Sequence, residues 1–185
     1  IRFLQSKGVK AIVIACNTAS ALALETVQPE FDIPILGVVK AGAKEAAKVT
    51  KNGKIGVIAT ESTIESQLYT KEIHSHKPNA QVLGKPCPLF VPLVEEGWLK
   101  DPVTVEVANR YLEPLLESGI DTLIMGCTHY PLLRSTLRQI MGEKVNLVNP
   151  AYETARELKS LLEREGLNND GKQNYEGAMH EFYVS

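Results

Sequence analysis

The chain has 185 residues, of which 44% are hydrophobic and 23% are charged, and its formal net charge is −2. This composition is typical of a soluble globular protein with one large or two small domains. The small charge gives no electrostatic basis for binding nucleic acid or an anionic membrane. No apolar run reaches the roughly 18 residues that span a bilayer. We therefore expect neither nucleic acid nor a membrane as a partner.

The first half of the chain alternates predicted strands and helices. Ala11–Ala15 is a continuous apolar run, typical of a strand buried on both faces of a parallel sheet. Asn17 and Thr18 are predicted to cap the helix that follows, and Ser62 and Glu65 have the spacing of a capping box. The remaining predictions are a strand at Ile33–Val39, a helix at Ala41–Val49, a strand at Lys54–Thr60 and a helix from Ser62 to about His74.

The second half continues this alternation, which predicts an α/β fold with parallel sheets and right-handed crossovers. The predicted elements are a strand at Gln81–Gly84, helices at Val91–Leu99 and from Pro102 to Gly119, a strand at Thr122–Met125, a helix at Leu132–Met141, a strand at Val145–Val148, a helix from Pro150 to Gly166 and a final strand at His180–Ser185. Because the chain starts without an initiator methionine and closes on this strand-like run, we expect it to be incomplete at both ends.

One sequence unit occurs twice: an apolar run ends in a cysteine, and polar residues and a predicted helix follow. The copies are Ala11–Ser20, with Cys16, and Thr122–Pro131, with Cys127. In open α/β sheets, ligands bind beyond the carboxyl ends of strands. The candidate site residues are therefore those at and just after three strand ends: Cys16, Asn17, Thr18, Thr60, Thr63, Cys127, Thr128 and His129.

The helix starts predicted after these strands suit a small, charged, polar substrate. A helix N-terminus offers free N–H groups and the positive end of a dipole, which bind a carboxylate. The same position lowers the pKa of a thiol from about 8.5 toward neutrality, and we expect this for both cysteines. Two thiols that face each other across a substrate can remove a proton from one face of a carbon and return one to the other. Such a pair inverts a stereocentre without a cofactor, and no Gly-rich phosphate loop is present.

Other interpretations of the cysteines remain open at this point. An odd number of cysteines in a chain of this length indicates a reducing compartment rather than a disulfide framework. For Cys87, which lies between two prolines, we favour the role of a small buried hydrophobic residue. Cys16 and Cys127 are also compatible with a non-catalytic small-molecule binding domain, with a disulfide, or with metal ligation together with His129.

At these residues the sequence closely resembles glutamate racemases of the aspartate/glutamate racemase superfamily. The matching motifs are Ala15–Ser20 (Ala-Cys-Asn-Thr-Ala-Ser) and Gly126–Leu133 (Gly-Cys-Thr-His-Tyr-Pro-Leu-Leu), supported by the segments Gly56–Thr63, Cys87–Gly97 and Phe182–Tyr183. The resemblance implies a cofactor-independent, homodimeric enzyme of the bacterial cytoplasm. Its reaction interconverts L-glutamate and D-glutamate and supplies D-glutamate for peptidoglycan.

The resemblance also implies a role for each matching residue. Cys16 and Cys127 transfer protons, Glu95 is a supporting carboxylate, and no metal takes part. The implied substrate contacts are Asn17, Thr18, Thr128 and His129, with Thr60 and Thr63 nearby. The nearest alternative is aspartate racemase, in which Glu typically follows the Cys-Thr pair, so His129 favours glutamate.

The implied fold has two Rossmann-like or flavodoxin-like domains, related by a pseudo-twofold axis, with the active site between them. The first domain consists of residues 1–37 and 149–185, and the second consists of residues 38–148. Family members begin with an Asp-Ser-Gly motif and a later Pro-Tyr-Gly motif, and both contribute to the substrate site. Neither motif occurs here. We therefore expect the first domain to lack its opening strands and this polypeptide to be inactive or poorly folded.

Overall fold

The computed structural model describes residues 1–169 and 180–184. Its strands are β1 (Ile12–Ile14), β2 (Ile35–Gly37), β3 (Lys54–Ala59), β4 (Gln81–Pro86), β5 (Thr122–Gly126) and β6 (Asn146–Val148). They form a two-stranded sheet, β1–β2, and a four-stranded sheet in the order β4–β3–β5–β6, and every pair is parallel. This arrangement confirms the predicted α/β fold with parallel sheets.

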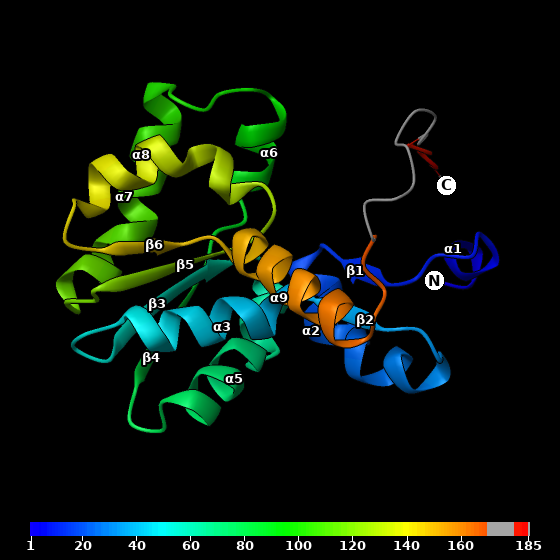
Figure 1. Ribbon diagram of the computed structural model, residues 1–185. Helices are drawn as coiled ribbons and strands as arrows, with labels where there is room; N and C mark the ends of the chain where they lie inside the picture. Colours follow the sequence, from blue (N-terminus) through cyan, green and yellow to red (C-terminus); the bar gives the residue numbers. More distant parts are fainter. Residues whose placement is uncertain (170–179, 185) are drawn as a thin grey trace.

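Helices connect successive strands (Figure 1). The α-helices are α1 (Arg2–Ser6), α2 (Asn17–Val27), α3 (Val38–Val49), α4 (Glu61–Glu65), α5 (Leu68–His76), α6 (Phe90–Glu95), α7 (Pro102–Glu117), α8 (Arg134–Met141) and α9 (Pro150–Arg164). Two 3₁₀-helices, η1 (Gln28–Glu30) and η2 (Tyr130–Leu133), complete the described elements. In this part of the chain, no helix has both the length and the apolar character needed to cross a membrane.

The four-stranded sheet has helices on both faces, with α7 and α8 on one face and α3 and α5 on the other (Figure 1). Side chains of its central strands alternate between two apolar clusters. Ile58, Leu123 and Met125 belong to the cluster with α7 and α8, whereas Ile55, Val57 and Ile124 belong to the cluster with α3 and α5. All six are almost completely buried. Each contributes about 1.5 to 3 kcal/mol by leaving water, so this sheet is the more stable support for a site.

The two-stranded sheet has a much smaller core, in which the buried residues are Ile12, Leu24 and Ile35. Val13, in the middle of β1, is 38% exposed. The prediction of a strand buried on both faces is therefore wrong for β1. The physical reason is that, within residues 1–169 and 180–184, β1 pairs with β2 alone, and Val13 lines an open hollow between β1 and Leu158 and Leu162 of α9.

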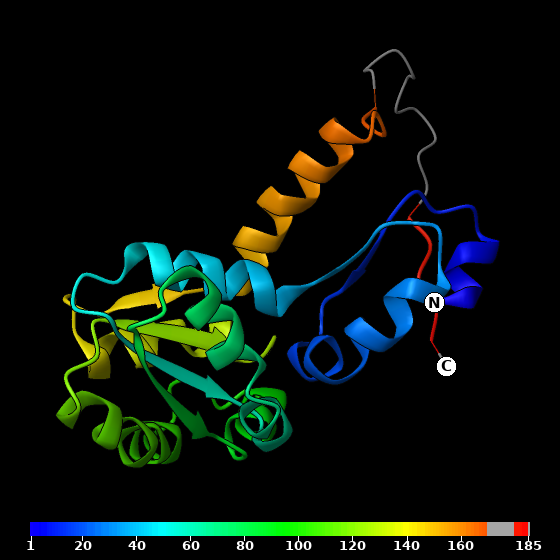
Figure 2. The same ribbon diagram turned by 90° about the horizontal axis from the view of Figure 1, so that it is seen from below.

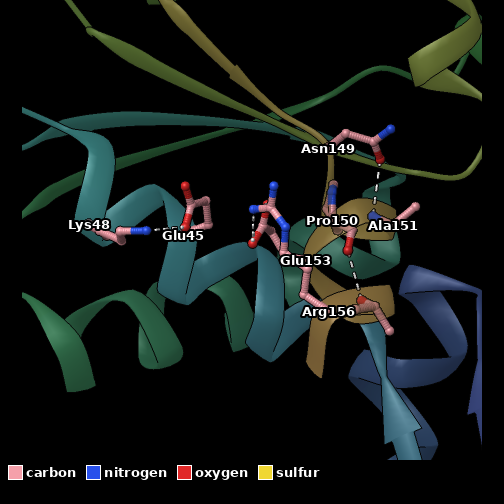
Figure 3. A network of polar contacts seen from close by, with 8 residues as sticks. Glu45, Lys48, Asn149, Pro150, Ala151, Glu153 and Arg156 are labelled. Carbon is pink, nitrogen blue, oxygen red and sulfur yellow. Dashed lines mark hydrogen bonds and ion pairs between the residues drawn. The ribbon is translucent and has the colours of Figure 1, made fainter. Parts of the chain in front are cut away.

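The two sheets are joined where α9 packs against α3. Figures 1 and 2 show α9 leaving the four-stranded sheet beside α3 and extending toward the side on which β1 and β2 lie. A Cβ atom built on Gly42 of α3 would lie 2.9 Å from Cγ of Pro150, so glycine permits this close packing. Asn149 starts α9 by accepting a hydrogen bond from the Ala151 N–H at 3.1 Å (Figure 3).

The helix predicted from Ser62 to His74 is broken in the structure. It consists of α4 and α5, and between them Gln67 adopts a left-handed conformation with φ of +54°. Thr60 is the N-cap of α4, and no side-chain capping bond forms, so the predicted capping box is wrong. The break redirects α5, and this redirection buries Tyr69 against the four-stranded sheet.

Near the C-terminus the prediction of a final strand is wrong for residues 180–184, which are not in a strand. The physical reason is that these residues are exposed and pair with no strand of the described chain. Residues 170–179 and 185, which belong to the predicted first domain, lie outside the described residues.

Asp121 fixes the amino ends of β3 and β5 relative to each other. Its carboxylate accepts hydrogen bonds from Thr50 Oγ1 at 2.6 Å and from the N–H groups of Lys51 and Asn52, both at 2.7 Å. Burial raises the pKa of this carboxyl, but the hydrogen bonds outweigh burial and hold the pKa below its ordinary value of 3.8. The charged carboxylate therefore helps to keep in register the two strands whose other ends carry the candidate site.

Candidate active site

The predicted site residues lie at the carboxyl ends of strands from both sheets. Cys16 follows β1, Thr60 follows β3 and Cys127 follows β5. In the order β4–β3–β5–β6, the chain continues outward from β3 to β4 and then crosses back to β5 on the other side. The topological switch point, where open α/β sheets bind ligands, therefore lies between β3 and β5. Thr60 and Cys127 flank it.

Three threonine hydroxyls connect the two sheets at this edge. Thr18, in the first turn of α2, lies 2.9 Å from Thr60 and 3.0 Å from Thr63, measured between the Oγ1 atoms. Thr60 and Thr63 are 2.9 Å apart, so the three hydroxyls form a closed ring. Each hydroxyl can donate one hydrogen bond and accept two. A ligand carboxylate can therefore replace a neighbouring hydroxyl as the acceptor.

Cys16 is the N-cap of α2, and its Sγ accepts a hydrogen bond from the Ala19 N–H at 3.4 Å. The predicted capping by Asn17 and Thr18 is wrong, because these residues are already the first two residues of the helix. Cys16 is exposed to solvent. Its sulfur is thus oriented by the start of a helix and accessible to a ligand.

Cys127 is 9% exposed, and its Sγ lies 3.7 Å from Nδ1 of His129. Burial raises the pKa of this thiol above its ordinary value of 9.0, and the charge of Cys16 raises the pKa further. Hydrogen bonds from the backbone of His129 and from Thr128 offset only part of this change. The predicted lowering of the pKa is wrong here, because burial is the largest effect and the 3₁₀-helix η2, not an α-helix, follows the thiol.

His129 links Cys127 to the carboxylate at the end of α6. Its Nε2 lies 3.2 Å from Oε1 of Glu95, while its other ring nitrogen faces the sulfur. The Glu95 side chain is 64% exposed, so this pair is open to solvent. A carboxylate on one ring nitrogen fixes the orientation of the imidazole and therefore of the nitrogen that faces the thiol.

Sequence reasoning missed Tyr69 as a residue of this site. Its hydroxyl donates a hydrogen bond to Oδ1 of Asn17 at 2.6 Å, and both side chains are buried. Burial raises the pKa of Tyr69, with a smaller contribution from the charge of Cys127, so the hydroxyl keeps its proton. No local pattern identifies this residue, since its position depends on the break between α4 and α5.

Cys87 lies in the apolar core and not at the site, which confirms its interpretation as a buried hydrophobic residue. It is completely buried, and burial raises the pKa of its thiol to about 12. All three cysteines are free thiols. Across residues 1–169 and 180–184, no three His, Cys, Asp or Glu side chains are grouped so that they can hold a metal ion.

Residues 1–158 match the family model of the Asp/Glu/Hydantoin racemases. The chain belongs to this racemase family. A glutamate racemase of Geobacter metallireducens is 49% identical over 160 residues, which cover 86% of this chain and 59% of that protein.

Solved structures of the racemase family have the same fold. The structure of a glutamate racemase isoform from Bacillus anthracis matches with a TM-score of 0.88 at 42% identity and covers 91% of this chain and 64% of its own. The glutamate racemase of Francisella tularensis, in complex with D-glutamate, matches with a TM-score of 0.85 at 39% identity, over 92% of this chain and 64% of its own. The chain thus spans 59% to 64% of the lengths of these three relatives.

The electrostatic interaction between the two thiols predicts a specific reactivity. Alkylation of Cys127 by iodoacetamide should have a pH midpoint above 9.0, because burial and the charge of Cys16 raise its pKa. In Cys16→Ser this midpoint should move to lower pH, because serine stays uncharged. Mass spectrometry of the modified peptides at neutral and alkaline pH measures both midpoints. Cys87, with a pKa of about 12, is the internal control that stays unmodified in the folded protein. An identical midpoint in the two proteins would contradict the interaction.

Proposed function

We propose that this protein is a glutamate racemase that interconverts L-glutamate and D-glutamate by proton transfer between Cys16 and Cys127. Membership of the racemase family and the glutamate racemase relatives support this proposal. The observation that carries it is that the hydroxyl ring of Thr18, Thr60 and Thr63 holds the helix capped by Cys16 against the end of β3. Strand β3 pairs with β5, the strand that Cys127 follows. Two thiols at one site can act as the acid and the base that inversion of a carbon centre requires.

The proposed reaction balances without an oxidant or a cofactor. The thiolate of one cysteine takes the α-proton of glutamate, so that the C–H bond breaks and an S–H bond forms. The electron pair left on the α-carbon is delocalised into the adjacent carboxylate. The thiol of the other cysteine then gives its proton to the opposite face of the carbon. The product is the enantiomer, and the two sulfurs have exchanged their protonation states.

The electrostatics of the cysteine pair disfavour two thiolates. Like charges at short range oppose simultaneous ionisation, so the two thiols do not ionise together. Because burial keeps the pKa of Cys127 above its ordinary value, Cys127 holds a proton at neutral pH. It is therefore the acid when Cys16 acts as the base, and the roles reverse in the other direction.

The polar groups around the thiols fit an amino acid with two carboxylates. We propose that the hydroxyl ring of Thr18, Thr60 and Thr63 donates to one carboxylate, while Asn17 and Thr128 donate to the substrate from beside the two cysteines. His129 donates to the substrate or to the thiol of Cys127, with Glu95 fixing its orientation. Hydrogen bonds to charged acceptors are worth about 1.5 to 3 kcal/mol each, enough to orient a small ligand.

The proposal includes the cellular role that the family resemblance implies. D-Glutamate made in the bacterial cytoplasm would supply peptidoglycan synthesis. We further propose that residues 1–37 and 149–185 form one domain and residues 38–148 the other, with the site between them, and that the protein is a homodimer. Light scattering of the purified protein tests the dimer, since a monomer mass would contradict it.

Cysteine substitutions test the proposed function directly. In the full-length protein, we expect Cys16→Ser and Cys127→Ser each to lower the racemisation of L-glutamate by at least about 10² to 10⁴-fold, because each removes one of the two proton carriers. Circular dichroism follows the inversion, and proton NMR in D₂O follows deuterium incorporation at the α-carbon. Cys87→Ala is the control, and it should keep activity while it is folded.

Two outcomes would contradict this proposal in different ways. Activity on L-aspartate but not on L-glutamate would identify an aspartate racemase. Deuterium incorporation that is unchanged in both serine variants would show that the cysteines are structural.

Substitution of Glu95 tests whether its contact with His129 matters for activity. Glu95→Gln should lower kcat/KM by about twofold to fivefold, the range expected for a solvent-exposed charged pair. The neighbouring Glu96→Gln is the matched control, because Glu96 is also exposed but its side chain makes no hydrogen bond or ion pair within the described part of the chain. Equal effects of the two substitutions on kcat/KM would exclude a specific role for Glu95.

A further inference from the structure

One buried side chain, Tyr69, touches the neighbours of both cysteines. Its hydroxyl donates to Oδ1 of Asn17, the residue after Cys16, at 2.6 Å. Its ring packs against Gly126, the residue before Cys127: a Cβ atom built there would lie 3.2 Å from Cε2 of Tyr69. The two cysteine segments belong to different sheets, so Tyr69 is a direct link between them.

The contact with Gly126 leaves no room for a larger residue. The same Cβ atom would lie 2.8 Å from the carbonyl oxygen of Ile58, closer than real side chains approach backbone. Glycine at this position therefore lets the Tyr69 ring lie directly on the last residue of β5. Any displacement of the ring would move the strand end from which Cys127 continues.

The hydrogen bond also decides which way the Asn17 amide faces. With Oδ1 occupied by Tyr69, the Nδ2 group lies on the opposite branch of the amide. Nδ2 makes no hydrogen bond within the described chain, and no fully buried side-chain nitrogen or oxygen there lacks a partner. Nδ2 therefore retains contact with solvent and is a free donor beside Cys16.

Gln67 supplies the backbone geometry that brings Tyr69 to this point. It has a left-handed φ of +54°, which is uncommon for a residue other than glycine. This residue separates α4 from α5 and is the N-cap of α5. The second residue of α5 is Tyr69, which is buried. Strained backbone of this kind persists where the surrounding structure requires it, and it clusters at functional sites.

We propose that Tyr69 is a positioning residue of the site: its hydroxyl turns the Asn17 amide so that Nδ2 donates to a carboxylate of the substrate, and its ring fixes the end of β5 before Cys127. This inference rests on the proposed function, because the ligand it requires is an amino-acid carboxylate. Tyr69 is buried away from solvent and acts through Asn17 and Gly126 rather than on the reacting atoms.

The test is Tyr69→Phe, which removes the hydroxyl and keeps the ring against Gly126. KM for glutamate should rise about threefold to tenfold, the effect of one lost neutral hydrogen bond, with a smaller change in kcat. The matched control is Tyr111→Phe, whose hydroxyl accepts from the Leu89 N–H at 3.4 Å in another part of the molecule. This control should leave KM unchanged. Thermal unfolding of both variants shows whether stability accounts for any difference.

A double-mutant cycle separates positioning from general packing. If Tyr69 acts through the amide, Tyr69→Phe combined with Asn17→Ala should have the KM of Asn17→Ala alone. An additive increase in KM, or an unchanged KM in Tyr69→Phe, would overturn the proposal.

Binding of D-glutamate is measured by calorimetry in four full-length proteins: the unsubstituted protein, Tyr69→Phe, Asn17→Ala and the double variant. This measurement distinguishes the present proposal from the proposed function. Binding without racemisation in the unsubstituted protein would refute the function alone, and Kd would then replace KM in the cycle. Racemisation by the unsubstituted protein, with no change of Kd or KM in Tyr69→Phe, would refute the positioning role alone. If the unsubstituted protein does not bind D-glutamate, the role of Tyr69 in carboxylate binding is refuted.

Discussion

The contact between the carboxyl ends of two separate sheets is the constraint on which the site depends. The hydroxyl ring of Thr18, Thr60 and Thr63 holds the first turn of α2 against the end of β3. Because Cys16 caps the same helix two residues earlier, fixing Thr18 also fixes the first thiol. The four-stranded sheet supplies the rigid side of this contact, since its central strands are buried on both faces. The close packing of Gly42 in α3 on Pro150 in α9 is a second contact that joins the two parts of the molecule.

The two thiols sit in unequal surroundings, and this difference has chemical consequences. Cys16 is exposed at a helix start, whereas Cys127 is buried beside His129. Desolvation disfavours the thiolate of Cys127, and the nearby charge of Cys16 disfavours it further. The two thiols therefore do not ionise together. A pair in which one member is ionised and the other protonated offers a base on one side and an acid on the other, which inversion of a carbon centre requires.

The sequence allowed prediction of those features that depend on local pattern. The apolar runs before Thr60 and Cys127 predicted buried strands, and the polar residues after them do lie at the carboxyl edge where parallel strands converge. Features that depend on tertiary packing could not be predicted from local pattern. The break at Gln67 carries no glycine signal, so the position of Tyr69 was not foreseen. The motif around Cys127 predicts a lowered pKa, whereas the pKa is raised, because burial, which no short motif encodes, outweighs the hydrogen bonds at the strand end.

We propose that Cys16 and Cys127 flank one carbon atom of a bound amino acid. A crystal structure of the protein with D-glutamate tests it most directly. We expect the two sulfurs to contact the α-carbon from opposite faces, with one substrate carboxylate at the hydroxyls of Thr18, Thr60 and Thr63. A bound D-glutamate with both sulfurs on the same face of the α-carbon, or with Cys16 out of contact, would contradict it.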